Sequence, residues 1–112
     1  MGISTHILDT SLGRPAAGVN VTLEERHGHE WVVLGAAVTD ADGRARDLLP
    51  EGRELKPGTL RLRFDVDEYF GRDGRQAFYP SVEIAFHVES GAEHYHVPLL
   101  LSPFGYSTYR GS

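Results

Sequence analysis

Apolar and polar residues alternate along VEIAFHVE (residues 82–89), the stretch of this chain that points most directly to its fold. The segments LRLRFD (60–65) and VNVTLE (19–24) repeat the same period of two. Alternation of this kind predicts β-strands with one buried face and one polar face. Three more segments are predicted strands: 3–9, 31–38 and 94–101. Regularly spaced short strands indicate a β-sandwich or a barrel.

Turn-forming residues separate the predicted strands. The segment 40–43, Asp-Ala-Asp-Gly, predicts a tight turn in which Gly43 takes a positive φ. Residues 12–15, Leu-Gly-Arg-Pro, end the first strand in the same way. One short helix is predicted over residues 67–72, with Asp67 as its N-cap.

The size and composition of the chain fit one small domain spanning residues 1–112. The absence of cysteine excludes disulfides and thiol chemistry. A formal net charge of −5 without a long basic block argues against nucleic acid as a partner. No apolar run approaches the roughly 18 residues that a membrane-spanning helix needs. The N-terminal residues lack the basic-then-apolar pattern of a signal peptide, so we expect a cytoplasmic protein with no membrane partner.

Three of the six histidines are placed where they can form a site. His6 lies on the strand face opposite to Ile3 and Ile7, so we expect it to point away from the core. His94 and His96 are two residues apart and therefore share a strand face. This arrangement fits solvated side chains, a lined cleft, or a metal site with three imidazole ligands, although no carboxylate stands out as a fourth ligand. The other histidines are expected to be solvated and without a role: His27, His29 and His87.

Four segments of the chain, taken together and in order, match one known family. They are STHILD (4–9), TDADGR (39–44), GTLRLRFD with the following EYF (58–70), and HYHVPLLLSPFGYSTYRGS (94–112). The chain thereby resembles the 5-hydroxyisourate hydrolases, the transthyretin-related proteins of purine catabolism. The final tetrapeptide Tyr-Arg-Gly-Ser makes the last segment the most specific of the four. The resemblance runs from about residue 3 to residue 112 without a large insertion.

The resemblance implies an all-β, transthyretin-like sandwich of two sheets, with about eight strands and one short helix. It implies a homotetramer, built as a dimer of dimers with a central channel. Catalytic roles would belong to His6, Arg44 and His96, and no metal or cofactor would be needed. Substrate would be bound by the tail residues Tyr109, Arg110, Gly111 and Ser112.

The implied reaction is hydrolysis of a ring amide in 5-hydroxyisourate, which gives 2-oxo-4-hydroxy-4-carboxy-5-ureidoimidazoline. A neutral imidazole is suited to deprotonate the attacking water near neutral pH, and we assign this role jointly to His6 and His96. Arg44 would supply permanent donors to carbonyl oxygens and to developing negative charge. Ser112 is expected to contact the substrate instead of acting as a nucleophile, because no Asp–His pair points to it.

Two other functions are open alternatives. One is a non-catalytic carrier of small aromatic ligands on the same fold, and the other is an interaction domain of a larger assembly. A carrier would not require the catalytic set, and the thyroid-hormone-carrying relatives lack the Tyr-Arg-Gly-Ser ending. The tail motif also argues against a pure interaction domain.

An apolar segment near the C-terminus predicts a subunit interface. Residues 99–101 are leucines on both strand faces, so both faces should be covered. Phe104, Tyr106 and Tyr109 follow closely, and such a cluster is typical of an interface between subunits. We therefore expect the active site to lie at this interface.

Overall fold

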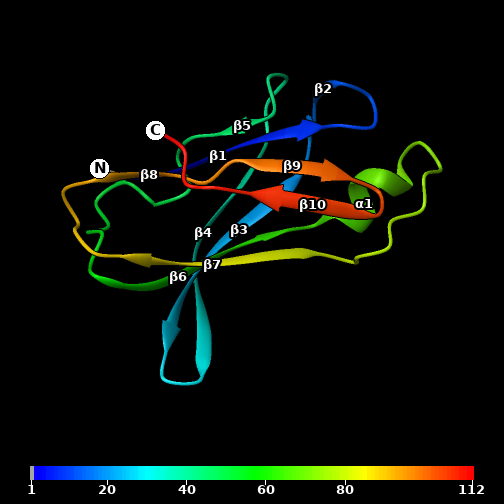
Figure 1. The fold of residues 1–112 in the computed structure, drawn as a ribbon. Helices are drawn as coiled ribbons and strands as arrows, with labels where there is room; N and C mark the ends of the chain where they lie inside the picture. Colours follow the sequence, from blue (N-terminus) through cyan, green and yellow to red (C-terminus); the bar gives the residue numbers. More distant parts are fainter. Residues whose placement is uncertain (1) are drawn as a thin grey trace.

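Two β-sheets pack face to face in the computed structural model, which describes residues 2–112 (Figure 1). The first sheet consists of β1 (Gly2–Asp9), β2 (Arg14–Pro15), β5 (Arg44–Ala45), β8 (His94–His96), β9 (Leu99–Ser102) and β10 (Gly105–Thr108). The second consists of β3 (Asn20–His27), β4 (Glu30–Val38), β6 (Gly58–Phe64) and β7 (Val82–Val88). The predicted all-β, two-sheet sandwich is confirmed. Met1, which the predicted domain 1–112 includes, lies outside the described residues.

Strand β1 is the centre of the first sheet. It pairs in parallel with β8 and β9, and antiparallel with β2 and β5. Strand β10 pairs with β9 and forms the edge. The second sheet is antiparallel in the order β4-β3-β6-β7, and its β3–β4 hairpin projects from the body of the molecule (Figure 1).

The core lies between the two sheets, on the faces that the alternation predicts. Ile3 and Ile7 of β1 are completely buried, as are Leu62 and Phe64 of β6. His6 of β1 and Arg63 of β6 lie on the opposite faces, whereas Thr5 shares the buried face and donates its hydroxyl proton to the carbonyl of Val97 at 2.6 Å. In β7, by contrast, the apolar residues at the middle of the strand are only half-buried, because β7 is the edge of its sheet.

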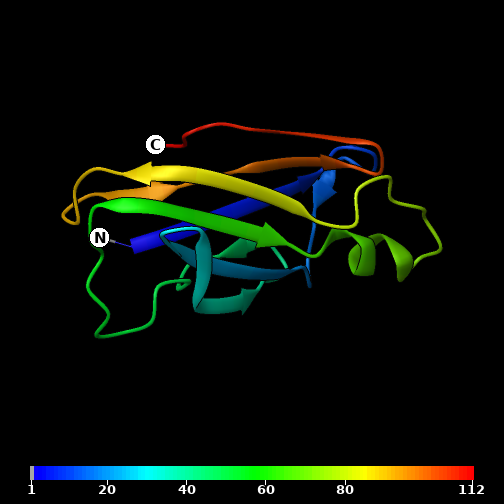
Figure 2. The same cartoon turned by 90° about the horizontal axis from the view of Figure 1, so that it is seen from below.

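The helix α1 (Val66–Gly71) begins one residue earlier than predicted, and Asp67 is not its N-cap. Asp65 takes that position, and its carboxylate accepts a hydrogen bond from the backbone N–H of Glu68 at 3.4 Å. Asp67 lies in the first turn instead, where a negative charge interacts favourably with the free N–H groups of the helix. Figure 2 shows α1 at one end of the sandwich, away from the C-terminus. No helix among residues 2–112 is long and apolar enough to cross a membrane.

The single strand predicted over residues 94–101 is two strands. At the break, the backbone N–H of Val97 still donates to the carbonyl of Ser4 at 3.0 Å, but Pro98 has no N–H to continue the ladder. Pairing with β1 resumes at Leu99, which lies opposite Ile7. Strands β2, β5 and β10 are additions to the predicted set.

A buried ionic cluster ties the end of β1 to the segment after α1. The carboxylate of Asp9 is inaccessible to solvent and accepts hydrogen bonds from Arg75 Nη1 at 2.9 Å, Tyr69 Oη at 2.8 Å and Ser11 Oγ at 2.6 Å. Burial alone would raise the pKa of Asp9, but the hydrogen bonds from Ser11, Tyr69 and Arg75 hold that pKa below its ordinary value. The cluster therefore stabilises the ionised carboxylate.

Replacing Arg75 with alanine is expected to lower the free energy of unfolding by about 3 kcal/mol, because it leaves a buried carboxylate without its cation. Unfolding in urea at one fixed protein concentration measures this loss. Arg26→Ala, at the exposed β3–β4 hairpin, is the matched control and should change stability by less than about 0.5 kcal/mol. A stability of Arg75→Ala equal to that of the control would contradict a structural role for the cluster.

Candidate active site

Three strands bring the predicted catalytic side chains onto one face of the first sheet. His6 of β1 lies opposite Arg44 of β5, and Ser4 of β1 lies opposite His96 of β8. Because side chains two residues apart share a strand face, Ser4 and His6 project on the same side of β1. The structure therefore brings His6, Arg44 and His96 together, although they are far apart in the sequence.

The turn before β5 fixes the position of Arg44. The carboxylate of Asp40 accepts hydrogen bonds from the backbone N–H groups of Asp42 at 2.9 Å and Arg44 at 3.0 Å. The hydrogen bond from the Arg44 N–H contributes most to holding the pKa of Asp40 below its ordinary value. Gly43 has φ of 76°, and a Cβ there would lie 2.5 Å from the carbonyl oxygen of Ile7. The predicted tight turn is confirmed, and its glycine is required for both reasons.

The same turn also orients His6. The carbonyl oxygen of Asp42 lies 2.9 Å from His6 Nε2, and a carbonyl can only accept a hydrogen bond. His6 Nε2 therefore donates, which leaves Nδ1 as the unprotonated nitrogen of the neutral ring. His6 thus has one nitrogen anchored on the turn and the other available for proton transfer.

His96 is held between β1 and the C-terminal tail. Its Nδ1 lies 2.8 Å from the Ser4 hydroxyl, and its backbone carbonyl accepts the N–H of Gly111 at 2.8 Å. Burial lowers the pKa of His96 below its ordinary value, and the nearby His6, His94 and Arg44 lower it further. The imidazole is consequently neutral at pH 7 and able to accept a proton.

The acid limb of the pH profile of kcat/KM is expected to have its midpoint below pH 6.5, the ordinary pKa of histidine. Activity is complete above that midpoint and falls as the pH drops through the lowered pKa, because protonated His96 is no longer a base. The facing groups are His6 on β1, Arg44 on β5 and His94 on β8. Titration of the His96 ring by NMR should give the same midpoint, and a midpoint above 6.5 would contradict the assignment.

An open depression of about 520 Å³ lies at this face of the sheet. It is lined by Ser4, Thr5, Arg44, Arg46, Asp47, His94, His96 and Ser112. The lining is polar and contains two guanidinium groups, which suits a small planar substrate with several carbonyl oxygens. Within the described part of the chain, no group of three histidine, cysteine or acidic side chains is arranged to hold a metal ion. In residues 2–112, His6, His94 and His96 are therefore not arranged as the three ligands of a metal site.

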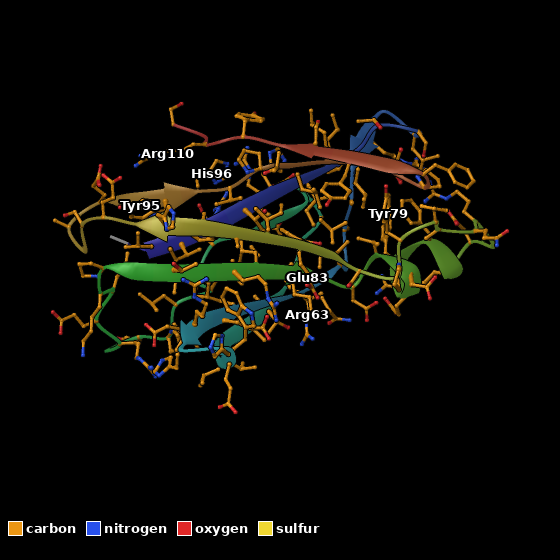
Figure 3. The ribbon with its side chains drawn as sticks, turned by 60° about the horizontal axis from the view of Figure 1, so that its bottom comes forward. Arg63, Tyr79, Glu83, Tyr95, His96 and Arg110 are labelled. Carbon is orange, nitrogen blue, oxygen red and sulfur yellow. The ribbon has the colours of Figure 1, made fainter. Side chains whose placement is uncertain are left out.

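The tail residues divide between two sides of β8. Ser112 lines the depression, and Gly111 packs directly against the His96 ring. Arg110 lies over the ring of Tyr95 at 4.9 Å, and its Nη2 is 3.4 Å from Glu93 Oε1. Figure 3 shows Arg110 beside Tyr95 and His96. Tyr109 and Arg110 instead line a separate hollow of about 240 Å³ next to β7, so the single chain does not bring them to the depression.

Some residues of the site were not predicted. Ser4 shares a face with His6, so the period of two was a signal that could have found it. Arg46 and Asp47 follow β5. Alternation places Arg46 near the face of Arg44, but no sequence motif distinguishes either residue from ordinary surface residues. The hairpin and β7 histidines lie elsewhere: His27 pairs with Glu25 at 2.6 Å, and His87 faces Thr59 at 3.4 Å.

A β-sandwich in which His94, His96 and Arg44 line one polar depression has the proton-transfer and anion-stabilising groups of an acid–base enzyme. The family model for the HIUase/Transthyretin family matches residues 3–111. This chain belongs to the HIUase/Transthyretin family.

Relatives named 5-hydroxyisourate hydrolase are similar to this chain along almost its whole length. The protein from Caulobacter vibrioides is 47% identical over 115 residues, covering 99% of this chain and 98% of its own. That from Salmonella typhimurium is 46% identical over 110 residues, covering 98% and 80%, respectively. The mouse protein is 43% identical over 112 residues, covering 98% and 94%.

Two solved structures are similar to this chain over almost its whole length. The 5-hydroxyisourate hydrolase of Klebsiella pneumoniae is 38% identical, with a TM-score of 0.85 and complete coverage of both chains. Sea bream transthyretin in complex with thyroxine is 31% identical, with a TM-score of 0.91 over 99% of this chain and 95% of its own. The fold is thus shared by a 5-hydroxyisourate hydrolase and by a transthyretin that binds thyroxine, so only the residues of the site can separate a hydrolase from a binding protein.

Proposed function

We propose that this protein is an enzyme that hydrolyses 5-hydroxyisourate to 2-oxo-4-hydroxy-4-carboxy-5-ureidoimidazoline in urate degradation. The observation that supports this most directly is the grouping of His6, Arg44 and His96 on one face of the first sheet, where Arg44 and His96 line a polar depression. The relatives that are 43–47% identical and named 5-hydroxyisourate hydrolase support the same conclusion. The carrier alternative is supported by the fold alone.

In the proposed mechanism, neutral His96 takes a proton from the attacking water. The hydroxide adds to the carbonyl carbon of a ring amide, and the carbonyl oxygen becomes an oxyanion. Arg44 stabilises this charge with its guanidinium donors, in a site where fixed charges need no reorganisation. Protonation of the leaving nitrogen then opens the ring. His6, with Nε2 anchored on Asp42, offers Nδ1 as the second proton-transfer group.

The proposal is tested by following the ultraviolet absorbance of 5-hydroxyisourate generated from urate by uricase, with and without this protein. We expect accelerated decay that persists in the presence of a chelator, since the proposed mechanism uses no metal. Decay at the uncatalysed rate with folded protein would refute the hydrolase assignment. Activity that disappears with chelator and returns with zinc would refute the metal-independent mechanism.

A homotetrameric assembly, arranged as a dimer of dimers, is part of the proposal. Phe104, Tyr106 and Tyr109 are 71%, 43% and 59% exposed in the single chain, and a patch of large exposed aromatics is typical of a protein interface. Strands β7 and β10 also leave one edge of each sheet unpaired. Light scattering measures the mass, and a monomer in solution would refute the assembly.

We also propose a cytoplasmic location, which fluorescence microscopy of the tagged protein in its host tests.

A further inference from the structure

Ser4 lies at the centre of the site but has no task in the mechanism above. It is 7% exposed, and its hydroxyl oxygen lies 2.8 Å from His94 Nε2 and 2.8 Å from His96 Nδ1. The parallel pairing of β1 with β8 produces this geometry, because it sets Gly2 opposite His94 and Ser4 opposite His96. One hydroxyl thereby bridges two imidazole rings.

A serine hydroxyl has a single proton, so it donates to one ring and accepts from the other. When it donates to His94 Nε2, it accepts from the N–H at His96 Nδ1, and His96 Nε2 is then free to act as a base. When it donates to His96 Nδ1, the proton of His96 sits on Nε2 and blocks that role. The direction of this one hydroxyl thus sets the protonated nitrogen in both rings.

We propose that Ser4 is a positioning residue that links His96 to His94 in a proton relay, with His94 as the end that faces solvent. This inference rests on the proposed function and assigns work to two residues that the mechanism above does not use. In the resting state, the Ser4 hydroxyl donates to His94, and His96 is protonated on Nδ1.

Each proton in the relay has a defined destination. Water loses a proton to His96 Nε2, the Nδ1 proton of His96 passes to the Ser4 oxygen, and the original Ser4 proton passes to His94 Nε2. The hydroxide forms its bond to the substrate carbonyl carbon, His96 ends neutral, and the positive charge resides on His94. The reverse sequence returns one proton to the leaving nitrogen, which restores the resting state.

The surroundings of the two rings determine the direction of the relay. His96 is half-buried and faces His6 and Arg44, so a positive charge on its ring is unfavourable. His94 is exposed, and water stabilises an imidazolium there. Transfer of the water-derived proton through Ser4 therefore moves the positive charge from a half-buried ring to an exposed one.

NMR of the ¹⁵N-labelled protein tests the resting state without any substrate. At about pH 7.5, where neutral histidine predominates, long-range ¹H–¹⁵N spectra should show both His94 and His96 protonated on Nδ1, the form that free histidine disfavours. Ser4→Ala should shift His96 toward the Nε2-protonated form. Wild-type His96 found with its proton on Nε2 would overturn the proposal.

Turnover tests the relay itself. Ser4→Ala is expected to lower kcat/KM about tenfold to a hundredfold, mainly through kcat, and Ser4→Thr should restore most of it. His94→Gln keeps an acceptor for the Ser4 hydroxyl but cannot take the proton, so the relay predicts the same loss. Because His94 is exposed, this variant should fold normally, and His29→Gln is its matched control.

Near-normal turnover in His94→Gln would overturn the relay, whatever Ser4→Ala does. A wild-type protein without turnover would instead refute the proposed function. The NMR experiment uses no substrate, so it would still test the hydrogen bonds of Ser4 to the two rings. The two failures are therefore distinguishable.

Discussion

Replacing His96 with alanine is expected to lower kcat/KM by about 10²–10⁴-fold, the range typical of a positioned general base. His96 is the imidazole whose burial and neighbouring groups hold its pKa below the ordinary value, so it is neutral and able to accept a proton. His6→Ala should produce a loss of the same order, since it removes the second proton-transfer group. The double variant should be little worse than either single variant, because groups that act as one unit are not additive.

The measurement is the steady-state rate of decay of enzymatically generated 5-hydroxyisourate for each variant. His27→Ala is the matched control, because His27 lies in the exposed hairpin, where its ring pairs with Glu25 at 2.6 Å. Its turnover should equal that of the wild type. Near-normal rates for both His6→Ala and His96→Ala would show that the proton-transfer groups lie elsewhere, and losses that multiply in the double variant would show that the two histidines act independently.

Alternation predicted those strands that bury one face inside the single chain. It gave no signal for β10, where Tyr106, Ser107 and Thr108 are all exposed and neither face is buried. Such an edge strand forms because it pairs with β9, and its own sequence shows no alternation of apolar and polar residues. The break between β8 and β9 did have a local cause, because Pro98 lacks the N–H that a continuous strand would use.

Physical reasoning from the sequence predicted less of the site than of the fold. The period of two placed His6 on the face away from the core, but its proximity to Arg44 depends on pairing between β1 and β5. Likewise, the contact between Ser4 and His94 joins residues 90 positions apart. Such registers are set by long-range packing, so the grouping of His6, Arg44 and His96 was predicted from the family resemblance and not from spacing.

Deletion of residues 109–112 is expected to abolish most of the turnover while leaving the fold intact. Beyond Thr108, the tail attaches through the hydrogen bond from the N–H of Gly111 to the carbonyl of His96 and through the exposed contacts of Arg110 with Tyr95 and Glu93. It contributes no residue to the buried core. Its removal exposes the His96 ring, takes Ser112 from the depression and admits water around the base. The loss of activity should therefore exceed the loss of stability.

Gly111→Ala tests the same contact with a single methyl group. A Cβ at residue 111 would lie 2.5 Å from His96 Cδ2 and 3.1 Å from Pro98 Cγ, so the His96 ring and the tail have to move apart. A displacement of this size in a proton-transfer group should lower kcat/KM by about tenfold to a hundredfold. Mass by light scattering, circular dichroism and turnover are measured on the same samples of both variants. A truncated protein that is folded and turns over normally would place the active site away from the tail, whereas a truncated protein that unfolds would contradict the peripheral attachment of residues 109–112.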